Sequence, residues 1–174
     1  MRPVARPGAH LTDGTAFAKV TMWAVSIAQD WCGCRRFAVV AAARWMTEGP
    51  LGLLIADDDA RLRSALREVF EPEGFRTYEA STGAEAVDVA QNEPVDLLMM
   101  DWQMPGMTGL EAFRLIKEML GLLPCILMTG APSKELLLNA LAEQAYTVLE
   151  KPISPGVAVY TVHRVVKVFY HRGS

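Results

Sequence analysis

The sequence predicts an α/β fold, a (βα)5 arrangement in which five parallel strands are each followed by a helix. From about residue 51 onward, short apolar runs alternate five times with segments whose apolar residues recur every three or four positions. The runs are apolar almost throughout, which is typical of parallel strands buried on both faces. We therefore expect a doubly wound sheet, covered by helices on both faces and joined by right-handed crossovers.

Each expected strand is an apolar run that ends at polar or turn-forming residues. The five strands are expected at residues 53–56, 75–80, 95–100, 124–128 and 146–149.

Helix boundaries are marked by residues that cap or break a helix. Pro72 and Gly74 end the first helix, and Thr108 with Glu111 has the spacing of a capping box that opens the third. The other starts carry a polar cap or a first-turn proline: Ser81 or Thr82, Ser133, and Pro155. We expect the last three helices to end near residues 120, 144 and 171.

The pattern divides the chain of 174 residues into two parts. Residues 47–174 form the patterned domain. Residues 1–46 form an unpatterned N-terminal extension, interpreted as disordered or as lying upstream of a native start at Met46. The apolar stretches at 16–28 and 37–43 are shorter than the ~20 residues that span a bilayer, and Lys19 interrupts the first, so neither a membrane anchor nor a signal peptide is expected.

Cysteine content and charge exclude further classes. Cys32, Cys34 and Cys125 make no paired framework, and the first two lack a second Cys/His pair for zinc, so we expect a cytoplasmic protein. Residues 1–46 hold 6 Lys/Arg and 2 Asp/Glu, whereas residues 47–174 hold 11 and 18. Because phosphate contacts need a clustered basic face, this acidic domain is not expected to bind nucleic acid.

In an open parallel sheet, ligands bind beyond the carboxyl ends of the strands. The polar residues expected at those ends are Asp57, Asp58 and Asp59 after the first strand, Asp101 after the third, Thr129 after the fourth and Lys151 after the fifth.

These residue types together suit phosphoryl transfer. Converging carboxylates repel unless a proton or cation neutralises them, and Mg²⁺ is the hard cation that such oxygens hold. Lys151 and Thr129 would add a positive charge and a hydroxyl donor for a transferring phosphoryl group, with Asp101 as the nucleophile. Each residue also has an ordinary explanation: an acidic triplet favours a helix N-terminus, Thr129 suits a turn, and Lys151 suits an exposed site before a proline.

Residues 51–171 resemble a response-regulator receiver domain of two-component signalling. The resemblance is carried by Asp57-Asp58, by Asp101 with Met104-Pro105 and Gly109, by Thr129, and by Lys151-Pro152. It implies the flavodoxin-like strand order 2-1-3-4-5 and Asp101 as phosphoacceptor. It also implies Mg²⁺ bound by Asp58, Asp101 and the Gln103 carbonyl, with Asp57 acting mainly through water, and Thr129 and Lys151 contacting the phosphoryl group.

The sequence departs from the family near the fifth strand. Gln144-Ala145 replaces the usual Gly-Ala, and Val148 stands where receivers carry an aromatic residue. Tyr146 is aromatic, and strand alternation would place it on the same side as Val148. Output is therefore expected to depart from the family's common Thr-aromatic coupling.

The resemblance implies a stand-alone switch that receives its phosphoryl group from a histidine kinase or a histidine phosphotransfer protein and acts on a downstream protein. Dimerisation through the final helix stays open, as does a relay role. A haloacid-dehalogenase-type phosphatase, suggested by Asp57-x-Asp59, and a phosphorylation-independent docking module are the disfavoured alternatives. No turnover of an external small molecule is expected.

Overall fold

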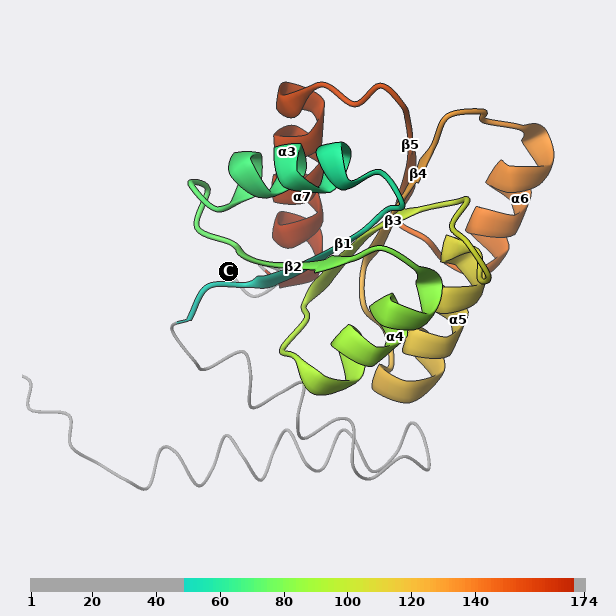
Figure 1. The fold of residues 1–174 in the computed structure, drawn as a ribbon, viewed down its shortest axis with the longest axis horizontal. Helices are drawn as coiled ribbons and strands as arrows, with labels where there is room; N and C mark the ends of the chain where they lie inside the picture. Colours follow the sequence, from blue (N-terminus) through green and yellow to red (C-terminus); the bar gives the residue numbers. More distant parts are fainter. Residues whose placement is uncertain (1–48, 171–174) are drawn as a thin grey trace, which may run out of the picture. The chain divides into compact units, whose positions relative to one another are not determined.

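The structure is a computed structural model and describes residues 49–170. Five strands and five helices alternate along this part of the chain (Figure 1). The strands are β1 (Gly52–Ala56), β2 (Arg76–Ala80), β3 (Leu97–Asp101), β4 (Cys125–Thr129) and β5 (Thr147–Glu150). The helices are α3 (Ala60–Phe70), α4 (Gly83–Asn92), α5 (Gly109–Leu120), α6 (Lys134–Ala142) and α7 (Pro155–Tyr170).

The strands form one sheet in the order β2-β1-β3-β4-β5, and every neighbouring pair is parallel. The three central strands β1, β3 and β4 are buried along their whole length, as their continuous apolar runs predict. The predicted (βα)5 fold and its strand order are confirmed.

Helices cover both faces of this sheet. Figure 1 shows α3 and α7 on one face and α4, α5 and α6 on the other. Alternate residues of a strand therefore enter different cores: Leu54 and Leu98 pack with Phe113 of α5, whereas Leu53 and Met99 pack in the core beneath α3 and α7. Among the described residues, no helix is long and apolar enough to cross a membrane.

The helix starts follow the capping chemistry of the sequence. Thr82, rather than Ser81, caps α4, and Ser133 caps α6. Thr108 and Glu111 form the predicted capping box of α5. Asp59 caps α3, since its side chain accepts a hydrogen bond from the Arg61 main-chain N–H.

An ion-pair cluster holds the end of α6 against α5. Arg114 Nη2 and Lys117 Nζ lie 2.6 and 3.0 Å from the two carboxylate oxygens of Glu143, which follows α6. Lys117 also donates to the Glu143 main-chain oxygen. Gln144, next in the chain, has φ of 63°, a left-handed conformation that glycine adopts without strain.

The expectation for Tyr146 is wrong. The fifth strand begins at Thr147, one residue later than predicted, so strand alternation does not extend to Tyr146. Its ring packs edge-on against Phe169 of α7, with 5.9 Å between ring centroids, while Val148 packs in the core on the side of α4 and α5. The two side chains therefore lie on opposite faces of the sheet.

The other strand boundaries differ from expectation by one or two residues. The third strand runs from Leu97 through Asp101, so that Asp101 is the last residue of the strand itself. The expectations for the extension at residues 1–46, for Cys32 and Cys34, and for the end of the last helix at His171 lie outside the described residues.

Candidate functional site

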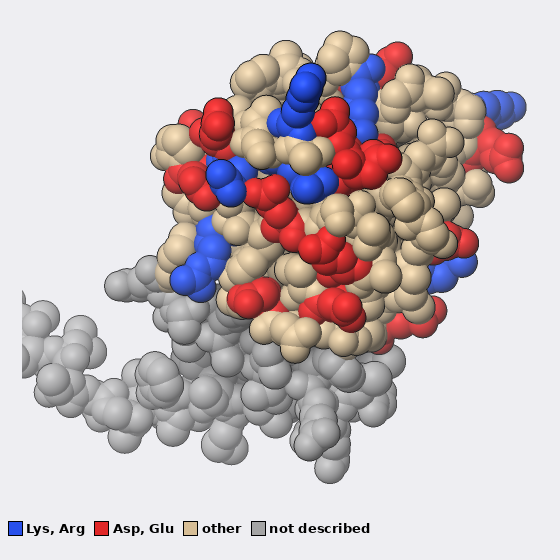
Figure 2. Space-filling model, viewed as in Figure 1, with Lys and Arg blue, Asp and Glu red and all other residues tan. Residues whose placement is uncertain are grey.

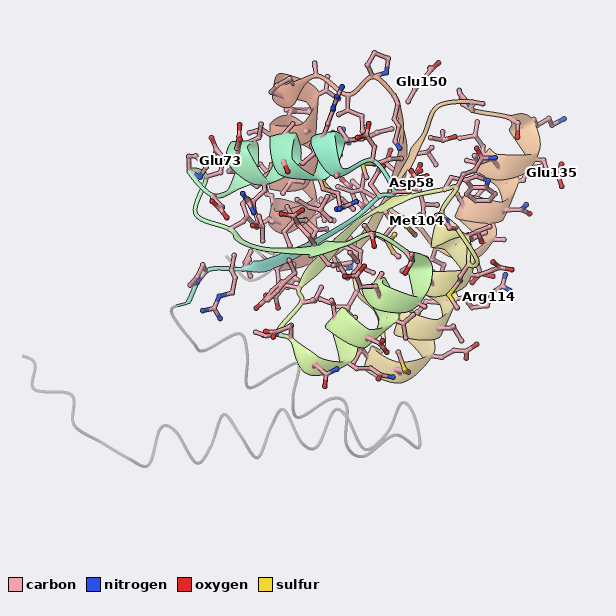
Figure 3. All side chains as sticks on the ribbon, viewed as in Figure 1. Asp58, Glu73, Met104, Arg114, Glu135 and Glu150 are labelled. Carbon is pink, nitrogen blue, oxygen red and sulfur yellow. The ribbon has the colours of Figure 1, made fainter. Side chains whose placement is uncertain are left out.

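Four of the predicted side chains reach the carboxyl edge of the sheet from separate strands. Asp57 follows β1, Asp101 ends β3, Thr129 ends β4 and Lys151 follows β5. Main-chain hydrogen bonds fix these strand ends, because Asp57 N–H donates to Ala80 O at 3.1 Å and Lys151 N–H donates to Thr129 O at 2.7 Å. Figure 3 shows Asp58 at this edge, and Figure 2 shows basic side chains mixed with acidic ones near α3, with acidic ones over α4.

Asp57 is fully buried, and its carboxylate pairs with a positively charged side chain. Its Oδ1 accepts a hydrogen bond from the Asp59 N–H at 2.9 Å. Its Oδ2 lies 2.7 Å from Lys151 Nζ, although the angles of this close ion pair fall outside hydrogen-bond geometry. A buried carboxylate oxygen without a well-aligned donor is a suitable ligand for a cation.

Lys151 bridges the two buried carboxylates, since its Nζ also lies 3.0 Å from Asp101 Oδ1. Burial lowers the pKa of Lys151, but the ion pairs with Asp57 and Asp101 outweigh burial, so the pKa is raised overall. The lysine is therefore positively charged at neutral pH. The Lys151–Pro152 peptide bond is cis.

Asp101 is nearly buried, at 6% exposure. Burial raises the pKa of its carboxyl group, Lys151 partly offsets this rise, and the neighbouring Asp57 carboxylate adds to it. A hydrogen bond from the Gln103 main chain contributes a smaller lowering. Asp101 is thus a carboxylate held close to one ammonium and one second carboxylate.

Gly109 and Gly83 allow the loop after β3 to pack closely. A Cβ at Gly109 would lie 2.0 Å from the Asp101 main-chain oxygen, and its N–H donates to Trp102 O at 3.1 Å. A Cβ at Gly83, the first residue of α4, would lie 2.8 Å from Met107 O. Only glycine fits either position without displacing the backbone.

Three carboxylates offer ligands for a metal ion. Oxygen atoms of Asp57, Asp58 and Asp101 all lie within 4.8 Å of one another, and Asp58 is exposed at the mouth of the cluster. Oxygen donors at this spacing fit a hard divalent ion such as Mg²⁺, which keeps several waters and takes one or two carboxylates. The donor chemistry therefore agrees with the predicted Mg²⁺ site.

The remaining predicted residues lie as follows. Thr129 is buried, and its Oγ1 accepts a hydrogen bond from the Ala131 N–H at 3.2 Å, a contact that does not use the hydroxyl proton as a donor. Gln103 stands two residues beyond Asp101, in the loop after β3. Asp59, the third residue of the acidic triplet, is used as the cap of α3 and is not part of the carboxylate cluster.

Sequence reasoning missed Arg63. This residue, on the first turn of α3, donates from Nη1 to the Asp57 main-chain oxygen at 2.6 Å. Six residues separate the two, and the contact depends on how the loop after β1 turns into the helix. The sequence offered no signal specific to Arg63, because Arg61 is also an arginine in the first turn of α3, where the helix dipole favours acidic residues.

Comparison with known proteins yields a family and a set of structural neighbours. Residues 53–163 match the family described as "Response regulator receiver domain". The sporulation initiation phosphotransferase F of Bacillus subtilis is 33% identical over 100 residues, covering 58% of this chain and 81% of that protein. Other relatives are longer regulators such as the DNA-binding transcriptional regulator NtrC of Escherichia coli, of which the chain spans 24%.

Solved structures resemble the fold closely. The chemotaxis protein CheY4 of Vibrio cholerae superposes with a TM-score of 0.65 at 27% identity, covering 67% of this chain and 99% of that one. The Borrelia burgdorferi CheX-CheY complex with BeF3 and Mg²⁺ gives a TM-score of 0.62 at 28% identity, covering 70% and 90%.

Proposed function

Because the chain belongs to the response regulator receiver family, whose members are phosphorylated on an aspartate, we propose that it is a phosphorylation-dependent switch whose acceptor is Asp101. The observation that carries this proposal is the position of Lys151 Nζ, 2.7 Å from Asp57 and 3.0 Å from Asp101. One ammonium thus faces both buried carboxylates at the carboxyl edge of the sheet. Receiver domains are signalling switches that interact with histidine kinases and with downstream targets.

Asp101 attacks the phosphorus atom of the donor through a carboxylate oxygen. The P–O or P–N bond to the donor breaks, the donor leaves with the electron pair, and an aspartyl phosphate forms on Asp101. Lys151 stays protonated and neutralises charge on the incoming phosphoryl oxygens. Thr129, whose contact with the Ala131 N–H does not use its hydroxyl proton, donates to one of those oxygens.

Asp57, Asp58, Asp101 and the main-chain carbonyl of Gln103 would hold Mg²⁺. When bound, this ion screens the approach of an anionic donor to Asp101. A related receiver solved with BeF3 and Mg²⁺ supports this assignment, because the beryllium fluoride group has the size and shape of a phosphoryl group.

A role as a relay intermediate is a second candidate. It is favoured by the similarity to a sporulation initiation phosphotransferase, of which the chain spans 81%. In a relay, the phosphoryl group would pass from Asp101 to a histidine of another protein.

The geometry disfavours a haloacid-dehalogenase-type phosphatase. Such an enzyme would need both carboxylates of Asp57-x-Asp59 in the site, but Asp59 accepts the Arg61 N–H as a helix cap. Two reactive carboxylates from this motif are therefore not presented together.

The test is incubation with a small acyl phosphate and Mg²⁺, followed by intact-mass measurement. We expect a gain of one phosphoryl group that requires Mg²⁺ and is lost in base. In parallel, a generic phosphomonoester should not be turned over. Absence of any mass gain with Mg²⁺ present, or steady turnover of the monoester, would overturn the proposal.

A further inference from the structure

Arg63 links the acidic cluster to the edge strand β2. Its Nη1 donates to the Asp57 main-chain oxygen at 2.6 Å, and its Nε lies 3.5 Å from Glu79 Oε2 on β2. The Arg63 side chain is 15% exposed and that of Glu79 is 29% exposed, so these contacts are partly shielded from water. Figure 1 shows why a residue of α3 can contact β2: α3 follows the end of β1 and packs over the sheet.

The main chain of Asp57 is held by two hydrogen bonds: its N–H donates to Ala80 O, and its carbonyl accepts from Arg63. Its carboxylate is held separately, because Oδ1 accepts from the Asp59 N–H and Oδ2 pairs with Lys151. Of the two main-chain contacts, only the one with Arg63 comes from a side chain, so a substitution can remove it without altering the strand or the turn.

We infer that Arg63 is a positioning residue, which fixes the main chain of Asp57 so that the Asp57 carboxylate stays directed at the cation site. The inference rests on the proposed function for the identity of the cation, Mg²⁺. Arg63 contacts Asp57 at its main-chain oxygen and not at its carboxylate, so it acts on the cation site through the backbone of Asp57.

Charge and positioning predict opposite signs for the loss of Arg63. A guanidinium beside the cluster repels an incoming divalent cation, so removing its charge alone would tighten Mg²⁺ binding. Removing the hydrogen bond to Asp57 O frees the loop and weakens binding, because groups that orient metal ligands typically contribute roughly 10- to 100-fold in affinity. The sign of the change therefore separates the two roles.

The test is calorimetric titration of Mg²⁺ into the full chain and its Arg63→Gln variant. We expect roughly tenfold weaker binding. Arg67→Gln is the matched control, because Arg67 also pairs with Glu79, at 3.0 Å, from the same helix. It should change the affinity less than about twofold, since a more exposed ion pair contributes little. Unchanged or tighter binding in Arg63→Gln overturns the inference.

Arg63→Lys tests the contact more finely. A lysine keeps the charge and one donor for the Asp57 carbonyl, but it lacks the second nitrogen that pairs with Glu79. Affinity should recover to within about threefold of the original chain. A lysine variant as weak as Arg63→Gln would mean that the fork geometry matters more than the donor to Asp57, against the inference.

A second measurement does not depend on Mg²⁺. The Asp59 N–H, which donates to Asp57 Oδ1, should exchange with solvent faster in metal-free Arg63→Gln than in Arg67→Gln. Equal exchange in the two variants overturns the inference. If the original chain binds no Mg²⁺, the proposed metal site fails, while this exchange measurement still decides whether Arg63 positions Asp57. If Arg63→Gln does not fold, Glu79→Gln, which loosens Arg63 from β2, takes its place with the same expected direction.

Discussion

Substitution of Gly109 by alanine should damage both stability and the acceptor. The new Cβ would lie 2.0 Å from the Asp101 main-chain oxygen and 2.9 Å from its carbonyl carbon, whereas ordinary contacts begin at 3.4 Å. The carbonyl must therefore move by more than about 1 Å, a rearrangement that costs about 1–3 kcal/mol in a packed interior. The hydrogen bond from the Gly109 N–H to Trp102 O would also be weakened, and its loss would cost up to ~1.5 kcal/mol more.

Gly156→Ala is the matched control for this substitution. Gly156 also lies in the first turn of a helix, but a Cβ there would meet no heavy atom within 4 Å. Alanine at this position should stabilise the chain by up to ~1 kcal/mol through helix propensity and reduced freedom of the unfolded chain. The same gain of ~1 kcal/mol credited to Gly109→Ala leaves it a net loss of roughly 0–3.5 kcal/mol, and because the gain cancels between the two variants, Gly109→Ala should be about 1–4.5 kcal/mol less stable than Gly156→Ala.

The assay for both variants is urea unfolding at equal slope, together with the rate of phosphoryl uptake from an acyl phosphate. A shift of about 1 Å at Asp101 should slow uptake on the order of 100-fold, because the attacking carboxylate is misplaced. A free energy of unfolding of Gly109→Ala within ~0.5 kcal/mol of that of Gly156→Ala, together with phosphoryl uptake at its original rate, would refute this reasoning. The close approach of Gly109 to the Asp101 main chain would then matter neither for stability nor for uptake.

Three further predictions concern other parts of the chain. The pKa of Glu143 is lowered, first by its hydrogen bond from Arg114 and then by that from Lys117. The stability that ionised Glu143 gives to the folded chain is therefore fully present above its ordinary pKa of 4.5, and it is lost as the pH falls through the lowered pKa of the folded state. Glu143→Gln should therefore be less stable by about 0.5–1 kcal/mol near pH 7 and equal to the original chain in acid, as urea titrations across pH will show; a deficit independent of pH would contradict this. A chain that begins at Met46 should unfold within ~1 kcal/mol of the full chain and accept phosphoryl groups at the same rate, and a larger loss would show that residues 1–45 stabilise the domain. Because Val148 has few rotamers and no ring, phosphorylation should change amide exchange mainly at residues 129–133 and the start of α6, with partner binding altered only a few-fold; large changes along α7 with residues 129–133 unaffected would refute it.

The fold was predictable because its central strands are continuous apolar runs. A run such as Leu53–Ile55 is apolar at every position, and five such short runs that alternate with helical patterns are typical of strands buried on both faces. Parallel order then brings Asp57, Asp101, Thr129 and Lys151 to one edge by topology alone. The convergence of these residues needed no side-chain geometry.

Individual side-chain roles were not predictable, because they depend on backbone conformation that composition and spacing do not encode. Asp58 and Asp59 are chemically identical, and only the phase of the turn into α3 leaves one at the cation site and makes the other a cap. Gln144 adopts a left-handed conformation that its residue type does not suggest. Tyr146 lies just outside the ladder of β5, so the alternation rule assigned it to the wrong face.

Locating the phosphoryl group on the chain decides whether Asp101 is the acceptor. The chain is phosphorylated with a small acyl phosphate and Mg²⁺. The aspartyl phosphate formed on the protein is then reduced to an alcohol, and the altered residue is identified by peptide mass spectrometry. We expect modification at Asp101 alone, no uptake in Asp101→Asn, and slowed uptake, still on Asp101, in the matched variant Asp58→Asn. Modification of another residue in the original chain, or undiminished uptake by Asp101→Asn, would contradict the assignment of Asp101 as the acceptor.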